Sequence, residues 1–162
     1  MTRARWPAFV MAIDDIMNFL PVSAELATAG QPTEDQLREI AREGFEIVIN
    51  LGLIDPSYCL ADEAGLVRSL GLEYHHIPVD FKGPTREDLR RFFELLQLSA
   101  GRRVFVHCAA NYRVSSFVSL YGQAKLGWPA VQADAHARRL WDLDEVWSNF
   151  LAESRRDLGI DN

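Results

Sequence analysis

The stretch VFVHCAANYRVS, residues 104–115, decides the fold and contains the residues of greatest chemical interest. It begins as a β-branched and aromatic run that is typical of a buried strand, and it ends in residues that favour a helix. A short loop of small residues lies between the two. In such a turn the loop N–H groups and the positive end of the helix dipole point toward the same place. The stretch therefore predicts an anion-binding loop at the carboxyl end of a strand.

Two side chains of this loop suit chemistry on an anion. Cys108 directly follows the strand, where the field of the helix end would favour its thiolate, the nucleophilic form. Arg113 carries a permanent charge and can offer a two-pronged fork to a tetrahedral oxyanion. His107 is expected to support the loop by hydrogen bonds rather than to shuttle protons. Tyr112 either lines the rim of the pocket or packs against the next helix.

Outward from this stretch, short apolar runs alternate with amphipathic segments. The expected strands are residues 26–29 (a weaker edge strand), 45–51, 72–79 and 103–107. The expected helices are residues 33–44, 61–70, 85–96, 114–126, 130–141 and 145–158. This alternation predicts an α/β fold, a three-layer sandwich with a largely parallel central sheet flanked by helices. In such sheets ligands bind at the carboxyl ends of the strands.

Helix boundaries carry specific signals. Thr33 and Gln36 form a capping-box pattern, and Gly44 ends that helix. Thr85 is expected to cap the helix that follows it, with Asp88 three residues further on.

The length of 162 residues fits one domain, residues 1–162, with its own core. Residues 1–25 are expected to form an N-terminal extension packed on the core, in which Phe9, Ile13, Ile16 and Phe19 indicate a helix over the sheet. Residues 128–162 are expected to form the C-terminal helices. Trp128, Trp141 and Trp147 there suit core packing better than base stacking.

Composition restricts the partners. The net charge of −6 argues against nucleic acid bound through a broad basic face, yet it leaves room for a small anion in a local positive pocket. No apolar run reaches 18 residues, so no membrane partner is expected. Two cysteines make no secreted disulfide framework, which favours a cytoplasmic protein. Neither CxxC nor HExxH occurs, and His75 and His76 point to opposite faces of a strand, so neither a metal nor another cofactor is expected.

The loop resembles the signature of the cysteine-based protein tyrosine and dual-specificity phosphatases. That signature is His-Cys, two residues, Gly, two residues, Arg, then Ser or Thr. His107 and Cys108 match it, and Asn111 stands at the glycine position, where it tolerates a left-handed backbone. The HCxANYR form resembles a small bacterial branch of these enzymes. The resemblance covers about residues 27–126 and implies a dual-specificity-phosphatase-like fold that hydrolyses phosphomonoesters through a cysteinyl-phosphate.

The resemblance also implies roles for the residues of the loop. Phosphate would be bound by Ala109, Ala110, Asn111, Tyr112 and Arg113. Ser115 would assist breakdown of the intermediate, although it would serve equally well as a first-turn residue that satisfies the loop backbone. The implied substrate is a phosphorylated small molecule or a phosphoprotein.

Asp80 is the candidate general acid, because the resembled family uses an Asp upstream of the cysteine. It follows a predicted strand, and Pro84 lies a few residues further on, as the family often has it. Alternatively, Asp80 starts a turn or pairs with Arg86. Asp88 is a weaker candidate, since capping already explains it. Some members of the resembled family protect the catalytic thiol by a disulfide with a neighbouring cysteine, so the resemblance also allows a Cys59–Cys108 bridge, but a spare buried cysteine is the favoured interpretation of Cys59.

The spacing departs from the signature in one respect. Four residues, not five, separate Cys108 from Arg113. By resemblance, rhodanese-like sulfurtransferases use the shorter count. A sulfurtransferase and a non-catalytic phosphate-binding module therefore stay open as alternatives to a phosphatase.

Overall fold

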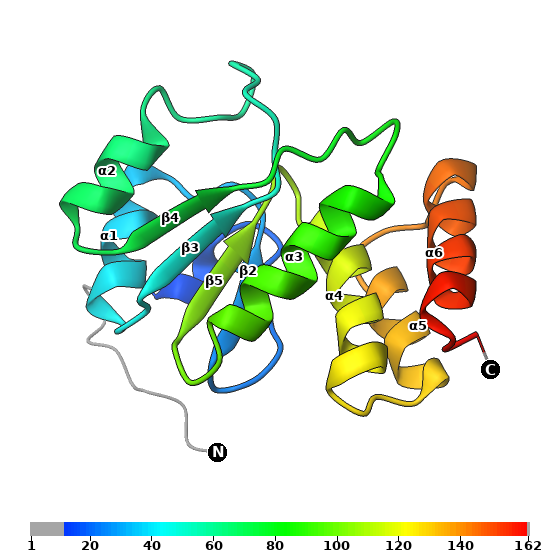
Figure 1. Cartoon of the computed structure of the whole chain (residues 1–162). Helices are drawn as coiled ribbons and strands as arrows, with labels where there is room; N and C mark the ends of the chain where they lie inside the picture. Colours follow the sequence, from blue (N-terminus) through cyan, green and yellow to red (C-terminus); the bar gives the residue numbers. More distant parts are fainter. Residues whose placement is uncertain (1–11, 162) are drawn as a thin grey trace.

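The computed structural model describes residues 12–161, which form one five-stranded sheet with helices on both faces (Figure 1). The strands are β1 (Leu20–Pro21), β2 (Leu26–Ala29), β3 (Ile47–Asn50), β4 (Glu73–His76) and β5 (Val104–His107). Their order is β1-β2-β5-β3-β4, and every neighbouring pair is parallel except β1 with β2. The predicted largely parallel sheet is confirmed, and β5, which leads into the loop, lies at its centre.

Six α-helices and one short 3-10 helix complete the described fold. They are η1 (Ile13–Asp15), α1 (Glu34–Arg42), α2 (Glu63–Ser69), α3 (Arg86–Leu98), α4 (Tyr112–Lys125), α5 (Ala130–Arg138) and α6 (Glu145–Leu158). The expected caps are present: Thr33 and Gln36 form a reciprocal capping box, and the Thr85 hydroxyl accepts the N–H of Asp88. Gly44 follows α1 with φ +93°, a conformation that favours glycine.

The sheet separates two apolar cores, because successive strand residues point to opposite faces. Ile47 and Ile49 pack with residues of α3, α4 and α6. Val48 and Phe105 pack on the other side with residues of η1, α1 and α2. This arrangement confirms the predicted three layers.

Two expectations about the N-terminal part are wrong. Residues 26–29 are not an edge strand, because β1 pairs outside them. Residues 13–19 form no α-helix: η1 makes a single turn, and Asn18 then has a left-handed backbone with φ 51°. The apolar spacing that suggested a helix reflects burial of Ile13 and Ile16 on the sheet. Phe9 lies outside the described residues.

Other boundaries shift by a few residues. Helix α5 ends at Arg138, short of the expected 141, and α4 begins at Tyr112, two residues earlier than expected. The early start of α4 matters for the site, because it places Arg113 inside the helix.

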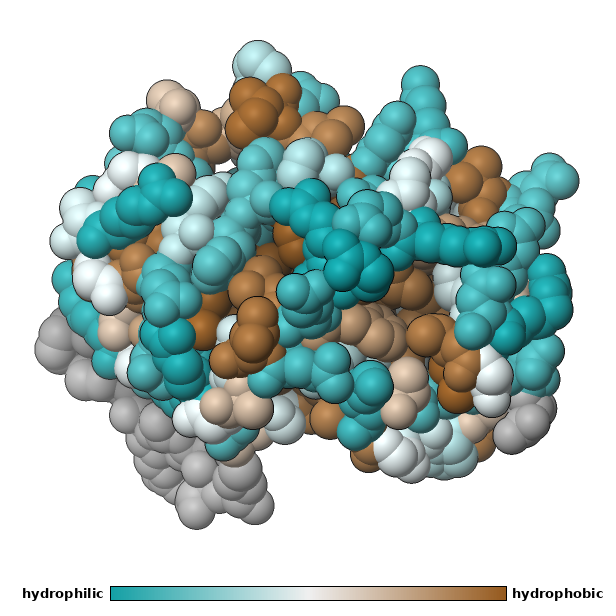
Figure 2. Space-filling model, in the orientation of Figure 1, coloured by the Kyte–Doolittle hydropathy of each residue, from teal (hydrophilic) through white to brown (hydrophobic). Residues whose placement is uncertain are grey.

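On the face that Figure 2 shows, hydrophilic residues predominate, with apolar residues scattered among them. Within residues 12–161, no helix combines the length and apolar character that crossing a membrane requires.

Candidate active site

The loop between β5 and α4 bends at Asn111. Its φ of 68° and ψ of 10° confirm the left-handed backbone expected at this position. The Ser115 N–H donates to the Asn111 carbonyl at 3.0 Å, which is the first bond of this helix end. The preceding N–H groups therefore have no place in the helical ladder and are available to an anion.

Side-chain amides brace the rear of the loop. Asn111 Nδ2 donates to the Asn18 carbonyl at 2.9 Å and to Thr28 Oγ1 at 3.0 Å. In return, Asn18 Nδ2 donates to the Ala110 carbonyl at 2.9 Å. The loop is thus fastened to β2 and to the turn before β1, both far away in sequence.

A close backbone approach fixes the first residue of the loop. The Gln31 N–H donates to the Ala109 carbonyl at 2.9 Å. A Cβ atom added at Gly30 would lie 2.7 Å from that carbonyl oxygen, so only glycine fits without displacing the loop.

Cys108 and Arg113 lie at the two ends of this loop. Cys108 is a free thiol with 1% of its surface exposed. Arg113 is also buried; its Nη1 donates to the Val79 carbonyl at 2.9 Å, and its guanidinium carbon lies 6.0 Å from the Tyr58 ring and 5.8 Å from the Phe81 ring. Because Arg113 is the second residue of α4, the loop needs only four residues between the two side chains.

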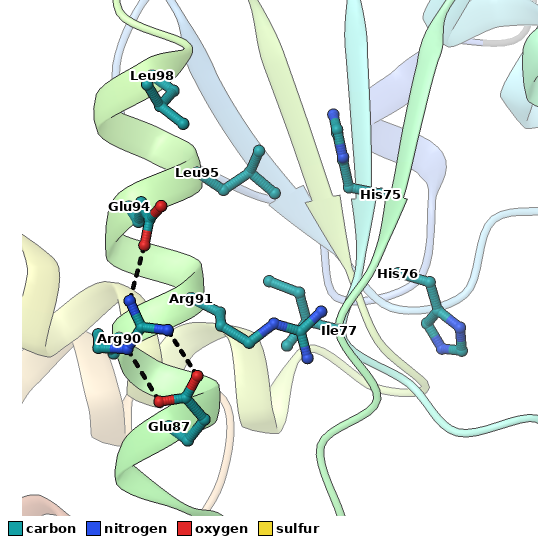
Figure 3. Close-up of a pocket in the computed structure, with 9 residues that line it drawn as sticks. All are labelled: His75, His76, Ile77, Glu87, Arg90, Arg91, Glu94, Leu95 and Leu98. Carbon is teal, nitrogen blue, oxygen red and sulfur yellow. Dashed lines mark hydrogen bonds and ion pairs between the residues drawn. The ribbon is translucent and has the colours of Figure 1, made fainter.

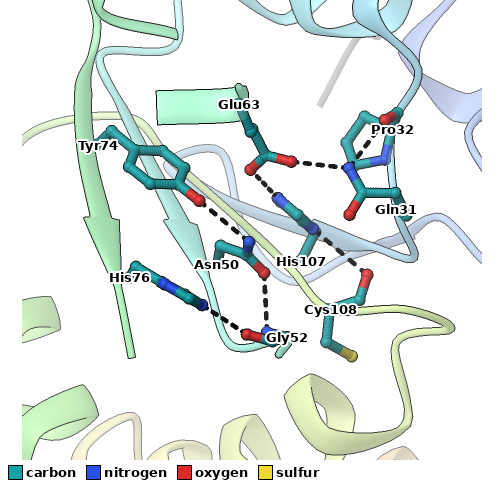
Figure 4. Close-up of polar contacts among 9 residues, drawn as sticks. All are labelled: Gln31, Pro32, Asn50, Gly52, Glu63, Tyr74, His76, His107 and Cys108. Atoms are coloured by element: carbon teal, nitrogen blue, oxygen red, sulfur yellow. Dashed lines mark hydrogen bonds and ion pairs between the residues drawn. The ribbon is translucent and has the colours of Figure 1, made fainter. Parts of the chain in front are cut away.

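A buried ion pair lies behind Cys108 (Figure 4). His107 Nε2 is 2.6 Å from Glu63 Oε2, and His107 Nδ1 is 3.3 Å from the Cys108 carbonyl oxygen. Gln31 Nε2 donates to Glu63 Oε1 at 2.7 Å. Burial raises the pKa of Glu63, but the charge of His107 and hydrogen bonds from His107, Gln31 and Tyr74 outweigh it and hold that pKa below its usual value.

Sequence reasoning missed Glu63. An acidic residue in the first turn of a helix is ordinarily an exposed partner of the helix dipole, so the pattern gave no reason to place it inside. The parallel crossover brings the start of α2 to the end of β5, 44 residues later in the chain.

The structure places Asp80 in a turn. Its Oδ1 accepts the Lys82 N–H at 2.9 Å, and its carbonyl accepts the Gly83 N–H at 3.1 Å. Arg86 pairs instead with Asp157 at 2.7 Å, so the alternative Asp80–Arg86 pair is wrong. Asp80 is exposed and stands between Val79 and Phe81, which are two of the residues next to Arg113. Its role as the acid stays a prediction.

Aromatic rings connect the Asp80 turn to the loop. Tyr112 stacks on Trp141 with centroids 4.7 Å apart and an interplanar angle of 3°, so it packs against the C-terminal region. The Phe81 ring lies 5.4 Å from the same Trp141, and Trp147 Nε1 donates to the Phe81 carbonyl at 2.8 Å. The expected packing role of Trp141 and Trp147 is confirmed.

The remaining candidates have structural partners. The Ser115 hydroxyl is buried and donates to the Tyr112 carbonyl at 3.3 Å. Cys59 is a free thiol, as is Cys108, so no bridge joins them.

Asp55, which the sequence did not single out, lies in the loop after β3. Hydrogen bonds from Ser57, followed by the charge of Arg113, hold the pKa of Asp55 below its ordinary value.

Several hollows lie outside the loop, and two of them border strand β4. One of about 500 Å³ is bordered by Ile54, Cys59, Tyr74 and His76, among others. Another of about 400 Å³ separates α3 from the edge strand β4, where Arg90 is paired with Glu87 and Glu94 (Figure 3). Within residues 12–161, no three His, Cys, Asp or Glu side chains are grouped as metal ligands.

Comparison with known proteins agrees with this geometry. The fold and the family match place the chain in the superfamily of protein tyrosine and dual-specificity phosphatases. Residues 9–146 match the family described as a DSP-PTPase phosphatase fused to NAD⁺ kinase, and the chain belongs to that family.

Individual relatives have similar sequences or folds. A "Beta-lactamase hydrolase-like protein" of Xylella fastidiosa is 30% identical over 107 residues, which are 64% of this chain and 25% of that protein, so the match spans about a quarter of this curated relative. A candidate phosphatase of the DUF442 group from Shewanella putrefaciens CN-32 is 31% identical, with a TM-score of 0.82 over 90% of this chain and 96% of that chain. Tk-PTP in its active form shares the fold, with a TM-score of 0.71 over 83% of this chain and 93% of that chain. The two sequences are 23% identical.

Proposed function

We propose that this protein hydrolyses phosphomonoesters through a cysteinyl-phosphate on Cys108. The observation that carries the proposal is the environment of Arg113. Arg113 is 5% exposed and its Nη1 donates to the Val79 carbonyl; Asp55 feels its charge, yet within residues 12–161 no carboxylate forms a direct ion pair with it. A buried cation that no carboxylate contacts directly is costly, so the site favours an anion beside Arg113 and the loop N–H groups.

The proposed reaction has two steps. The Cys108 thiolate attacks phosphorus, a P–S bond forms and the P–O bond to the leaving group breaks, while Asp80 gives its proton to the leaving oxygen. Asp80 then takes a proton from water as the water oxygen attacks phosphorus and the P–S bond breaks. Ser115 donates a hydrogen bond to the departing thiolate.

Binding of the phosphoryl group belongs to the other residues of the loop. Arg113 holds two equatorial oxygens with its fork, and the N–H groups of residues 109–113 stabilise the charge that spreads over those oxygens. His107 supports the loop from behind. We propose a phosphorylated small molecule or a phosphoprotein as the substrate.

Hydrolysis of p-nitrophenyl phosphate tests the proposal. Cys108→Ser should lower kcat by more than about a thousandfold, because serine is not ionised at neutral pH. The matched control is Cys59→Ser, which should retain turnover since Cys59 lies outside the loop. Turnover that survives Cys108→Ser would contradict the proposal.

The spacing of four residues between Cys108 and Arg113 favours one second candidate, a rhodanese-like sulfurtransferase. Transfer of sulfur from thiosulfate to cyanide, with no ester hydrolysed, would assign that function. Vanadate or phosphate binding with neither reaction would instead assign a non-catalytic phosphate-binding module.

A further inference from the structure

The Glu63–His107 pair behind the proposed nucleophile is almost entirely buried, although Glu63 borders the hollow of about 500 Å³. The side chain of His107 is 0% exposed and that of Glu63 is 5% exposed. Figure 4 shows the imidazole between the carboxylate on one side and the backbone of Cys108 on the other. The desolvation of a buried ion pair is costly unless its geometry is good and further hydrogen bonds satisfy its remaining polar atoms, so the partners of each atom in this pair decide its charge state.

Both nitrogens of His107 face acceptors. Nε2 lies 2.6 Å from a Glu63 carboxylate oxygen, and Nδ1 lies 3.3 Å from the Cys108 carbonyl oxygen. A backbone carbonyl has no proton to give, and an ionised carboxylate has none either. A neutral imidazole would turn one bare nitrogen toward an oxygen lone pair. The contacts are therefore satisfied best by the imidazolium, which has an N–H on each side.

The surroundings keep Glu63 ionised as the counter-ion. Gln31 Nε2 donates to its second oxygen at 2.7 Å, and Tyr74 adds a hydrogen bond. Tyr74 itself stays protonated, since burial and then the charge of Glu63 raise its pKa far above the ordinary value. Arg68 lies 5.9 Å from the Tyr74 ring.

The other charged groups lie toward the thiol side. Arg113, in α4, contacts Val79 and the Phe81 ring, and Asp55, in the loop after β3, is close enough to feel its charge. His76, on β4, is directed to the Gly52 carbonyl at 2.6 Å rather than to Glu63. Glu63 is thus the carboxylate that contacts His107.

We propose that Glu63 is a positioning residue that keeps His107 protonated behind Cys108, so that the imidazolium stabilises the Cys108 thiolate. Its effect on catalysis rests on the proposed function, whereas its effect on the thiol does not. Glu63→Gln removes the counter-ion and nearly preserves the shape. His107 then becomes neutral, and Cys108 loses a neighbouring positive charge.

Alkylation of Cys108 by iodoacetamide across pH measures this effect without any turnover. In a Cys59→Ser background, Glu63→Gln should move the midpoint of alkylation upward by about one pH unit, which is roughly tenfold less thiolate in the acidic range. The matched control, Glu87→Gln, removes an exposed carboxylate paired with Arg90 and should leave the midpoint in place. An unchanged midpoint in Glu63→Gln would overturn the proposal.

Two further measurements distinguish an electrostatic effect of Glu63→Gln from damage to the fold. In the unmodified protein, ¹⁵N–¹H spectra of the His107 ring should show two protonated nitrogens at neutral pH, and a single protonated nitrogen would overturn the proposal. In a His107→Gln background, Glu63→Gln should add no further shift of the midpoint. A further shift would show that Glu63 acts on Cys108 by another route and would likewise overturn it.

Turnover separates this inference from the proposed function. If the acidic limb of kcat/KM for p-nitrophenyl phosphate moves upward together with alkylation, both stand. A shifted alkylation midpoint in a protein that hydrolyses no ester supports Glu63 and contradicts the phosphatase. Turnover lost with alkylation unchanged gives Glu63 a merely structural role and overturns the inference.

Discussion

At the scale of single residues, Asn111 determines the shape of the loop. Its left-handed backbone turns the chain into α4, and its amide fastens the loop to Asn18 and Thr28. Asn111→Ala should lower the free energy of unfolding by about 2–3 kcal/mol, from strain at positive φ and the lost hydrogen bonds. Asn111→Gly keeps the backbone freedom and should cost about 1 kcal/mol less. Urea unfolding measures both, and equal losses would contradict a role for the backbone conformation.

Gly30 is the second residue with a sharp local consequence. Gly30→Ala places a methyl group against the Ala109 carbonyl and should displace the loop. We expect KM for p-nitrophenyl phosphate and the Kd for vanadate to rise about tenfold, since small displacements of a binding loop are costly. Gly83→Ala, where a Cβ would meet open space, is the control for vanadate binding. Unchanged binding in Gly30→Ala would show that the loop tolerates the shift.

Residue identity predicted some of these features and not others. The left-handed backbone at Asn111 follows from the chemistry of asparagine at a glycine position, so the sequence was sufficient. Glu63 and Asp55 could not be found in this way, because only the fold brings Glu63 to His107 and Asp55 within reach of the charge of Arg113. Such contacts leave no periodic trace in a single sequence.

At the scale of elements, the Asp80 turn is held by the C-terminal region. Phe81 packs on Trp141, and its carbonyl accepts the Trp147 indole N–H. Because Trp141 also stacks on Tyr112, one ring contacts both the turn and the loop. The turn is thus anchored at Phe81, the residue next to the proposed acid.

Trp141→Leu should loosen this anchor and misplace Asp80. For phenyl phosphate, whose leaving group needs a proton, kcat should fall about tenfold. For p-nitrophenyl phosphate, whose leaving group is a stable anion, the fall should be smaller. Trp128→Leu is a matched control, since Trp128 packs on His136 and Gly122. Equal losses for both esters would contradict the proposed role of Asp80.

The sequence predicted helices and strands well wherever it contained a capping residue or a periodic pattern of apolar residues. The capping box at Thr33, the cap at Thr85 and helix 145–158 appear where they were expected. Strand β1 has only two residues, one of them Pro21, too few to form an alternating pattern. It pairs with β2 across the short turn between them and leaves no pattern of its own, which explains why residues 26–29 were wrongly predicted to be an edge strand.

At the scale of the whole molecule, stability should depend on pH through His136. Burial, and then the charge of Arg139, lower its pKa to about 4 from an ordinary 6.5. Between these values the unfolded chain binds a proton that the folded protein does not, so stability falls as pH drops from 6.5 toward 4. The pKa of Glu63 is lowered from its usual value of 4.5, so Glu63 also makes the folded protein less stable as pH falls below 4.5.

His136→Phe tests this dependence. It keeps a ring beside Trp128 and removes the titrating group, so the decline in unfolding free energy between pH 7 and pH 4 should be smaller by about 2 kcal/mol. Urea unfolding at several pH values measures the difference. Identical pH profiles for the two proteins would place the acid sensitivity elsewhere.

The alternation of strands and helices in the sequence was sufficient to predict the three layers. The carboxyl end of the strand at 104–107 was sufficient to predict where the site lies. The four-residue spacing could not be understood that way. Its explanation is that α4 begins at Tyr112 and takes Arg113 into its first turn. The start of a helix depends on the backbone of Asn111 and on its tertiary bonds, as well as on local propensity.

The most direct test of the central claim is to trap the covalent intermediate. The protein is mixed with p-nitrophenyl phosphate, quenched in acid within the first turnover, digested and analysed by mass spectrometry. We expect one phosphoryl group on the peptide that contains Cys108, and none on that peptide in Cys108→Ser. Hydrolysis of the ester with no phosphoryl group on Cys108 at any quench time would contradict a cysteinyl-phosphate intermediate.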